Sequence, residues 1–211
     1  MWFDYIKAHP EKEWDPTSIS ENPNVTIDDV RENPQFAWNF VYLYNNPNMF
    51  IDELDALDNP QNDPKYTYGK YSFNPNITQE FIRANFDKKW LYMQLSSNPA
   101  ITWDFVQANP DKSWNYYYLS MNPNITWEIV QANLDKDWSF DELSRHPNIT
   151  WDIIQANPDK PWYYPYVSQN PNITWDIVDA NPDKPWDYGF LSRNKMSKHP
   201  FFQRQLSYVL K

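Results

Sequence analysis

Acidic residues that recur at regular spacing are the first groups in this sequence that could do chemistry. Asp104, Glu128, Asp152 and Asp176 lie 24 positions apart, and Ca²⁺ prefers oxygen ligands at about 2.3–2.6 Å. Stacked helices have axes about 8–10 Å apart, so carboxylates from successive layers start too far apart to share one ion. Their place in the first turn of a predicted helix suits the positive end of the helix dipole. We therefore interpret them as structural and predict no metal site.

Groups that could act as nucleophiles, bases or phosphate binders are few. The chain has no Cys, 3 His and 2 Gly, which excludes disulfides, thiolate metal sites, cysteine nucleophiles and glycine-rich phosphate loops. His9 and His146 stand where the repeat described below has Asn, so we interpret them as turn residues. The acidic run from Asp52 to Asp63 could hold a hydrolytic dyad, but a solvated acidic face explains it more simply. The sequence predicts a protein that is not an enzyme and binds no cofactor.

The charge of the chain argues against two classes of partner. With 28 Asp and Glu against 18 Lys and Arg, the net charge is -10, which repels nucleic-acid phosphates and anionic membrane surfaces. No basic segment followed by an apolar stretch opens the sequence, and no run approaches the ~18 apolar residues of a membrane span. We therefore expect a soluble, intracellular protein that is not secreted, and we expect its Asn-x-Thr sequences to be turn and helix-cap residues rather than glycosylation sites.

A repeat of 24 residues organises the chain. The copies share the pattern N-P-N-I-T-W-D-I-V-Q-A-N-P-D-K-P-W-x-Y-x-x-L-S-x, and their first prolines are spaced by 24 residues with one interval of 28. These prolines are Pro23, Pro47, Pro75, Pro99, Pro123, Pro147 and Pro171. We predict a single repeat domain over residues 1–211, with an N-terminal half unit at 1–21, seven repeats at 22–193, and a C-terminal cap at 194–211 that contains a helix from about Pro200.

Each repeat is expected to form two short helices. In one copy Thr126 is a good N-cap, Trp127 follows as the first helical residue, and Asn133 ends the helix. The second helix is expected to begin near Pro161 or Pro185, because Pro suits the first helical position. Helices of about 8 residues fall below the ~12–15 needed for stability alone, so the repeats must stack. The predicted class is all-α, an α-solenoid; the alternative is a β-solenoid, because N-I-T-W-D-I-V is also rich in strand formers.

Tryptophan recurs at two positions of the repeat. These rings recur in successive copies together with Ile and Leu, so we interpret them as a continuous core between stacked repeats. A platform that stacks sugars or bases is the alternative. The first set is Trp103, Trp127, Trp151 and Trp175, and the second is Trp90, Trp114, Trp138, Trp162 and Trp186.

One stretch carries a resemblance to a known family. Residues 167–188 read V-S-Q-N-P-N-I-T-W-D-I-V-D-A-N-P-D-K-P-W-D-Y, and this phrase resembles the tandem repeat proteins that giant DNA viruses of amoebae and other protists encode in many copies. The resemblance covers roughly residues 22–193. It implies a viral origin and action inside an infected host cell, in its cytoplasm, or in the virus particle. It implies no activity.

The positions that differ from copy to copy can determine which partner the protein binds. They cluster one, three and four residues after the second tryptophan, and solenoids use such rows as binding surfaces. We predict a non-enzymatic scaffold that binds a protein partner here, and the alternative is a structural component of the virus particle or viral factory that acts by self-association. The candidate protein-binding residues are Tyr117, Tyr118, Asp141, Glu142, Tyr166 and Phe190.

The two ends of the chain differ in charge. Residues 194–211 contain Lys195, Lys198, Arg204 and Lys211 and no acidic residue, a charge of +4, which leaves -14 for residues 1–193. Opposite charges at the ends of a rod favour head-to-tail contact at low ionic strength. The sequence therefore predicts weak head-to-tail self-association.

Overall fold

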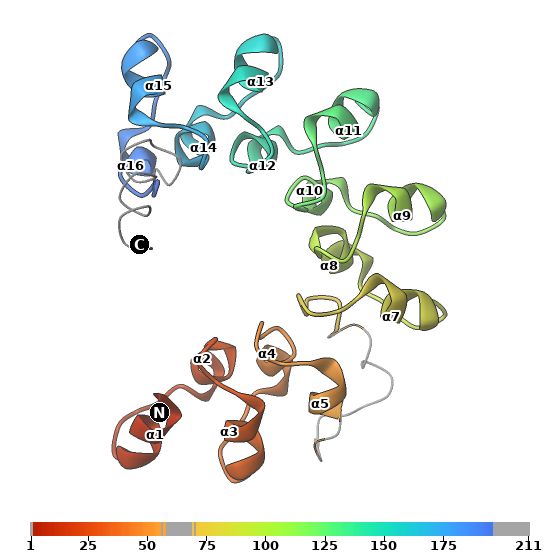
Figure 1. Ribbon diagram of the computed structural model, residues 1–211, viewed down its shortest axis with the longest axis vertical. Coiled ribbons are helices and arrows are strands. Elements are labelled where there is room, and N and C mark those ends of the chain that lie inside the picture. The colour runs from red at the N-terminus through yellow and green to blue at the C-terminus, as the bar shows by residue number, and fades with distance from the viewer. Residues whose placement is uncertain (1, 56, 58–68, 70, 196–211) are drawn as a thin grey trace, which may run out of the picture. The chain divides into compact units, whose positions relative to one another are not determined.

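The computed structural model describes residues 2–55, 57, 69 and 71–195, and within them the chain forms short α-helices joined by turns (Figure 1). The described residues contain fifteen short helices and no strand. The predicted all-α solenoid is confirmed, and the β-solenoid alternative is wrong. The helix expected from about Pro200, and the part of the acidic run that begins at Asp58, lie outside the described residues.

The helices fall into two alternating sets and two compact units. Unit 1 is Met1–Ile101 and unit 2 is Thr102–Lys211. The first helices of the repeats are α1 Trp2–Ala8, α3 Ile27–Glu32, α5 Ile51–Asp55, α7 Gln79–Ala84, α9 Trp103–Ala108, α11 Trp127–Ala132, α13 Trp151–Ala156 and α15 Trp175–Ala180. The second helices are α2 Pro16–Glu21, α4 Phe40–Leu43, α8 Tyr92–Ser97, α10 Tyr116–Leu119, α12 Phe140–Ser144, α14 Tyr164–Gln169 and α16 Tyr188–Leu191. Within unit 2 the second helices lie on the inner side of a curve and the first helices on its outer side (Figure 1).

The first helices begin and end where the sequence predicts. Thr150 and Thr174 are N-caps whose hydroxyls accept from the third helical N–H, and Thr126 caps α11 by its backbone conformation. At the other end, the Asn157 side-chain amide donates to the Ile153 carbonyl at 2.8 Å, and its own carbonyl accepts from the Trp162 indole at 2.8 Å. Each asparagine therefore closes one helix and fixes the tryptophan of the following turn.

The second helices begin later than predicted. α14 starts at Tyr164 rather than near Pro161, and α16 starts at Tyr188 rather than near Pro185. The cause is a turn at the tryptophan that follows the proline. The backbone N–H of Trp162 donates to the Lys160 carbonyl at 2.8 Å, and this turn delays the start of the helix. The second helices are consequently only four to six residues long, shorter than the expected 8 or so.

In unit 2, a serine at the end of each of α10, α12 and α14 joins that repeat to the next one. The Ser144 hydroxyl donates to the Phe140 carbonyl at 2.6 Å and accepts the backbone N–H of Tyr163, 19 residues later, at 2.9 Å. The same link joins Ser120 to the N–H of Ser139 and Ser168 to that of Asp187, both at 2.9 Å. The acceptor in each link is the serine hydroxyl and the donor is a backbone N–H. The serine is therefore the only side chain that the link requires.

The asparagine that opens each repeat is a second buried link. Asn170 is fully buried, and its amide donates to the carbonyls of Ser144 at 2.9 Å, His146 at 3.1 Å and Ile149 at 3.0 Å. Its side-chain oxygen accepts the Asn172 N–H at 2.8 Å. One side chain thus satisfies polar backbone groups of two repeats, which would otherwise be costly to bury.

His9 and His146 make hydrogen bonds equivalent to those of the asparagines at the same repeat positions. His146 is 3% exposed; its Nδ1 accepts the Asn148 N–H at 3.1 Å, and its Nε2–H donates to the Asn122 carbonyl at 3.0 Å. At the helix-ending position, the His9 Nδ1 donates to the Tyr5 carbonyl at 2.8 Å. These contacts support the interpretation of the two residues as turn residues, and the Nε2-protonated form of His146 is the one that satisfies both of its partners.

The stability of the protein should depend on pH through His146. Burial lowers the pKa of this imidazole below its ordinary value of 6.5, so the unfolded chain binds the proton more readily than the folded chain. The contribution of His146 is complete above pH 6.5 and is lost as the pH falls through the lowered folded pKa. We expect the urea midpoint to drop between about pH 7 and pH 5.5, and the drop to be smaller in His146→Asn, which restores the repeat's own residue. Equal drops in both proteins would contradict this assignment.

The core is built by tryptophan pairs that cross from one repeat to the next. The Trp151 and Trp186 ring centroids are 5.3 Å apart, and those of Trp127 and Trp162 are 5.6 Å apart. Each pair therefore joins the first tryptophan of one repeat to the second tryptophan of the next, rather than equivalent rings to each other. In unit 1 the same contact is made by Phe3 on Trp38, at 5.0 Å.

Candidate functional site

The structure brings the candidate protein-binding residues together on the second helices of unit 2. Tyr117 and Tyr118 lie on α10, and the others follow on the next three second helices. α12 packs against α14, and α14 packs against α16. We call this surface the second-helix face; its residues are Tyr117, Tyr118, Asp141, Arg145, Tyr163, Tyr166, Phe190 and Arg193.

Glu142 lies beneath this face rather than on it. Its side chain is 3% exposed, and its carboxylate accepts from the Tyr117 hydroxyl at 3.0 Å and from Arg145 Nε at 2.8 Å. The hydrogen bond to the Glu142 carboxylate raises the pKa of Tyr117 above 10, so the phenol stays protonated and keeps donating. Glu142 therefore positions Tyr117 and Arg145 from below, and contact with a partner falls to its neighbours.

Aromatic and guanidinium groups continue the face toward the C-terminal repeats. The Arg145 guanidinium lies 4.6 Å from the Tyr166 ring centroid, within the range of a cation–π contact. Tyr166 contacts the Phe190 ring edge-on at 6.0 Å, and Arg193 lies 5.8 Å from the Phe190 ring. Tyr117 is 47% exposed and Tyr163 is 44% exposed, so the face presents aromatic rings that are held in place and still accessible.

Some variable positions turn out to be structural. Asn115, Ser139 and Asp187 follow the second tryptophan, and their side chains accept from the N–H three residues later as N-caps. Their choice among Asn, Ser and Asp is the ordinary preference for that role. Conversely, Arg145 and Arg193 were missed by the sequence analysis. They occupy the last position of the repeat, which also varies between copies and could have signalled them.

Arg145→Ala should destabilise the protein more than Arg193→Ala. Removing Arg145 leaves the buried Glu142 carboxylate without its charged partner, and hydrogen bonds to charged groups contribute about 1.5–3 kcal/mol. We therefore expect a loss of about 2 kcal/mol in the free energy of unfolding, whereas Arg193→Ala removes only a ring contact and should cost less than about 1 kcal/mol. Urea unfolding of the two variants measures the difference, and equal losses would mean that the Glu142 pair adds nothing.

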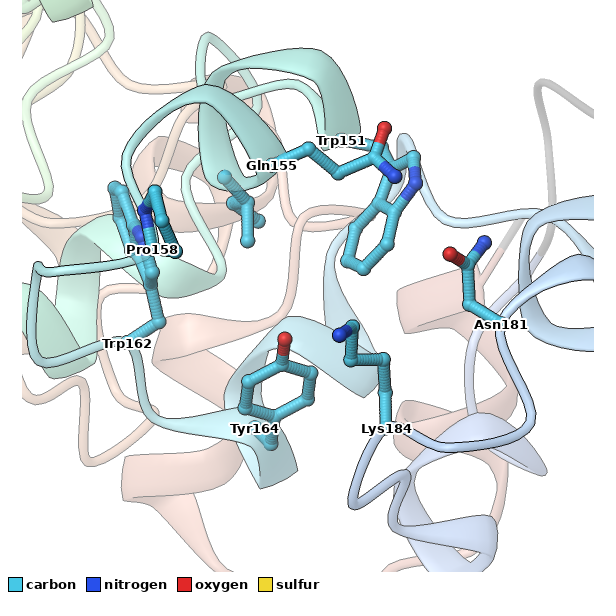
Figure 2. Close-up of a pocket in the computed structure, with 8 residues that line it drawn as sticks. Trp151, Gln155, Pro158, Trp162, Tyr164, Asn181 and Lys184 are labelled. Atoms are coloured by element: carbon cyan, nitrogen blue, oxygen red, sulfur yellow. The ribbon is translucent and has the colours of Figure 1, made fainter.

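Two pockets repeat between the layers of unit 2. One encloses about 330 Å³ against Trp151, Trp162 and Tyr164 (Figure 2), and its counterpart encloses about 360 Å³ against Trp103, Trp114 and Tyr116. Tyr164 and Lys184 reach toward each other at one side of the first pocket (Figure 2). Burial raises the pKa of Tyr164 and of Tyr116, so both phenols remain protonated.

The pockets lie on the seam between repeats, and their rings serve the core. Trp151 is 7% exposed and packs on Trp186, while the Trp162 indole N–H is taken by the Asn157 carbonyl. Lys184 is paired with Asp183 at 3.0 Å. The main use of these tryptophans is therefore the core packing that the repeat predicts.

The recurring acids do not gather into a metal site. Within the described ranges, no group of three or more His, Cys, Asp or Glu side chains is placed to hold a metal ion. Glu128 instead bonds with the hydroxyl of its N-cap Thr126, and this hydrogen bond lowers the pKa of Glu128. Nor does any helix in the described part of the chain combine the length and apolarity that a membrane crossing requires.

Comparison with protein-family models, with curated proteins and with solved structures finds no match to this chain. The function is therefore inferred from the geometry of the chain's own residues.

Proposed function

We propose that this protein is a non-enzymatic repeat scaffold that binds a protein partner through the second-helix face of unit 2. The observation that carries the proposal is the exposure of ordered aromatic rings on α10 and at the start of α14, with Tyr117 at 47% and Tyr163 at 44%. Aromatic side chains and Arg dominate the binding energy of protein interfaces. The resemblance to giant-virus repeat proteins supports a place for this scaffold in the host cell or the virus particle.

The support beneath the face favours binding without rearrangement. The buried Glu142 carboxylate holds Tyr117 and Arg145, and Arg145 in turn covers the Tyr166 ring. Side chains fixed in this way lose little rotamer freedom when a partner arrives, which lowers the entropic cost of binding. Asp141 is exposed beside them and offers a negative charge to a partner's basic group.

The test uses the tagged full-length protein to capture partners from a host-cell lysate, beside the double variant Tyr117→Ala/Tyr163→Ala. Leu134→Ala is the matched control, because Leu134 is 47% exposed, as Tyr117 is, but lies in the turn after a first helix. We expect a stoichiometric partner to be captured by the wild type and the control, and to be lost from the double variant. Capture that is equal in all three proteins would reject this face as the binding surface.

A further inference from the structure

The last described repeat presents an aromatic slot. In each earlier repeat of unit 2, the equivalent slot is filled by a tryptophan of the following repeat. In those repeats the ring of the next second tryptophan lies between two rings of the repeat before it. Trp186 packs 5.3 Å from Trp151 and 5.7 Å from Tyr164, and Trp162 packs 5.6 Å from Trp127 and 5.3 Å from Phe140. The arrangement is the same each time.

In the last repeat the equivalent two rings are exposed. Trp175 is 41% exposed, whereas Trp127 and Trp151 are 6% and 7% exposed. Tyr188, which stands where Tyr164 does, is 67% exposed. The serine link is open as well: Ser192 is exposed, and its hydroxyl donates to the Gly189 carbonyl at 2.8 Å, which leaves its oxygen able to accept. We call Trp175, Tyr188 and Ser192 the end slot.

The complementary half of this interface lies in the first helix pair. Trp14 occupies the second-tryptophan position, and its indole donates to the His9 carbonyl at 2.7 Å, as its counterparts do to Asn. Its one ring contact among the described residues is with Tyr5 of its own repeat, at 6.3 Å. The next residue, Asp15, has the backbone N–H that in later repeats donates to the serine of the preceding repeat. In the described part of unit 1 that N–H makes no hydrogen bond.

We infer that the end slot binds Trp14 of a second copy of this chain, so that copies join head to tail. The junction continues the interface between repeats: Trp14 would lie between Trp175 and Tyr188, and the Asp15 N–H would donate to Ser192. Asn194 opens the following repeat, because its amide donates to the Ser168 and Asn170 carbonyls at 3.0 and 2.8 Å. A second copy would supply the rest of that repeat from its first helix pair.

Sequence and charge also favour a second copy over the chain's own C-terminal residues. Residues 194–211 contain no Trp, while the filled slots of unit 2 all hold one. Residues 194–211 carry +4, and residues 1–21 carry five acids and two lysines, a net charge of -3. Opposite net charges on the two ends of the sequence attract one copy to another at low ionic strength. An interface of this kind is heterologous, so it grows into open chains unless its rotation closes a ring.

Complementation between two defective ends is the decisive experiment. Sedimentation velocity at low ionic strength is run on the full-length wild type, Trp14→Ala, Trp175→Ala and their equimolar mixture, with Leu134→Ala as the control. We expect the wild type and control to associate with rising concentration, and each single variant to associate at least about tenfold more weakly. The mixture should form a 1:1 dimer that does not grow, because one intact slot meets one intact Trp14. Tyr188→Ala should weaken association in the same direction as Trp175→Ala.

Two results would overturn the inference. A wild type that stays monomeric at every concentration would mean that the chain's own C-terminal residues, or nothing, occupies the slot. Association of Trp14→Ala alone at wild-type strength would mean that copies meet through another surface. Circular dichroism and urea unfolding of each variant establish that the single substitutions leave the fold intact, and the mixture provides the same check internally. The result is independent of the second-helix face, whose test uses Tyr117 and Tyr163.

Discussion

Asn170→Ala should lower the free energy of unfolding by about 3 kcal/mol or more, although it removes only a small polar side chain. The Asn170 amide reaches the three carbonyls of Ser144, His146 and Ile149, and its oxygen accepts the Asn172 N–H. The site is fully buried, so no water replaces these partners. Each buried group left unsatisfied costs about 1–3 kcal/mol.

Asn170→His is the matched comparison, because the chain itself uses His in this role. At His146 one ring nitrogen accepts the Asn148 N–H and the other donates to the Asn122 carbonyl. Asn170→His should therefore lose about half as much stability as Asn170→Ala, or less, at pH 8, where the imidazole is neutral. Urea unfolding at that pH measures both variants. If Ala and His cost the same, shape rather than hydrogen bonding dominates at this position.

The first helices were predictable because their signals are local. Thr150 caps α13, and Asn157 ends it through a hydrogen bond to the carbonyl four residues earlier. Both contacts lie within one short stretch of chain, and the residue types that make them have few other uses in such positions. The repeat period likewise needs only the sequence compared with itself.

The start of the second helices was not predicted because two local rules compete. Pro161 and Pro185 favour a helix that begins with them, whereas Asp187, Ser139 and Asn115 are N-cap residues placed after the tryptophan. The helix starts after the tryptophan because the Trp186 backbone N–H donates to the Lys184 carbonyl and its indole donates to the Asn181 carbonyl, both at 2.8 Å, which holds a turn there. Other copies have Ala37, Lys89, Ser113 and Asp137 in place of these prolines, which was a usable sign that Pro does not start the helix.

Contacts between repeats were beyond reach of the sequence for a different reason. The serine link uses a backbone N–H as donor, which every residue except Pro possesses, so nothing in the residue types marks the partner. The burial of Glu142 likewise depends on Tyr117 and Arg145, which come from two different repeats. A row of variable residues indicates a candidate face, but which members point outward is decided by packing.

Trp151→Ala and Trp175→Ala make the same change at the same position of the repeat and should differ several-fold in effect. Trp151 is 7% exposed and packs on Trp186 at 5.3 Å, so its removal leaves a cavity between two repeats, at a cost of about 3–5 kcal/mol. Trp175 is 41% exposed, and its removal should cost about 1 kcal/mol in the monomer.

Urea unfolding at a protein concentration below the onset of association measures both variants. Sequence alone assigns these two residues the same role, so the contrast tests whether burial by the next repeat is what makes a tryptophan stabilising. A Trp175→Ala loss as large as that of Trp151→Ala would mean that other parts of the chain cover Trp175, and it would remove the end slot as well. A loss near 1 kcal/mol would mean that no other part of the chain covers Trp175. A tryptophan from a second copy could then gain the stabilisation that a filled slot provides.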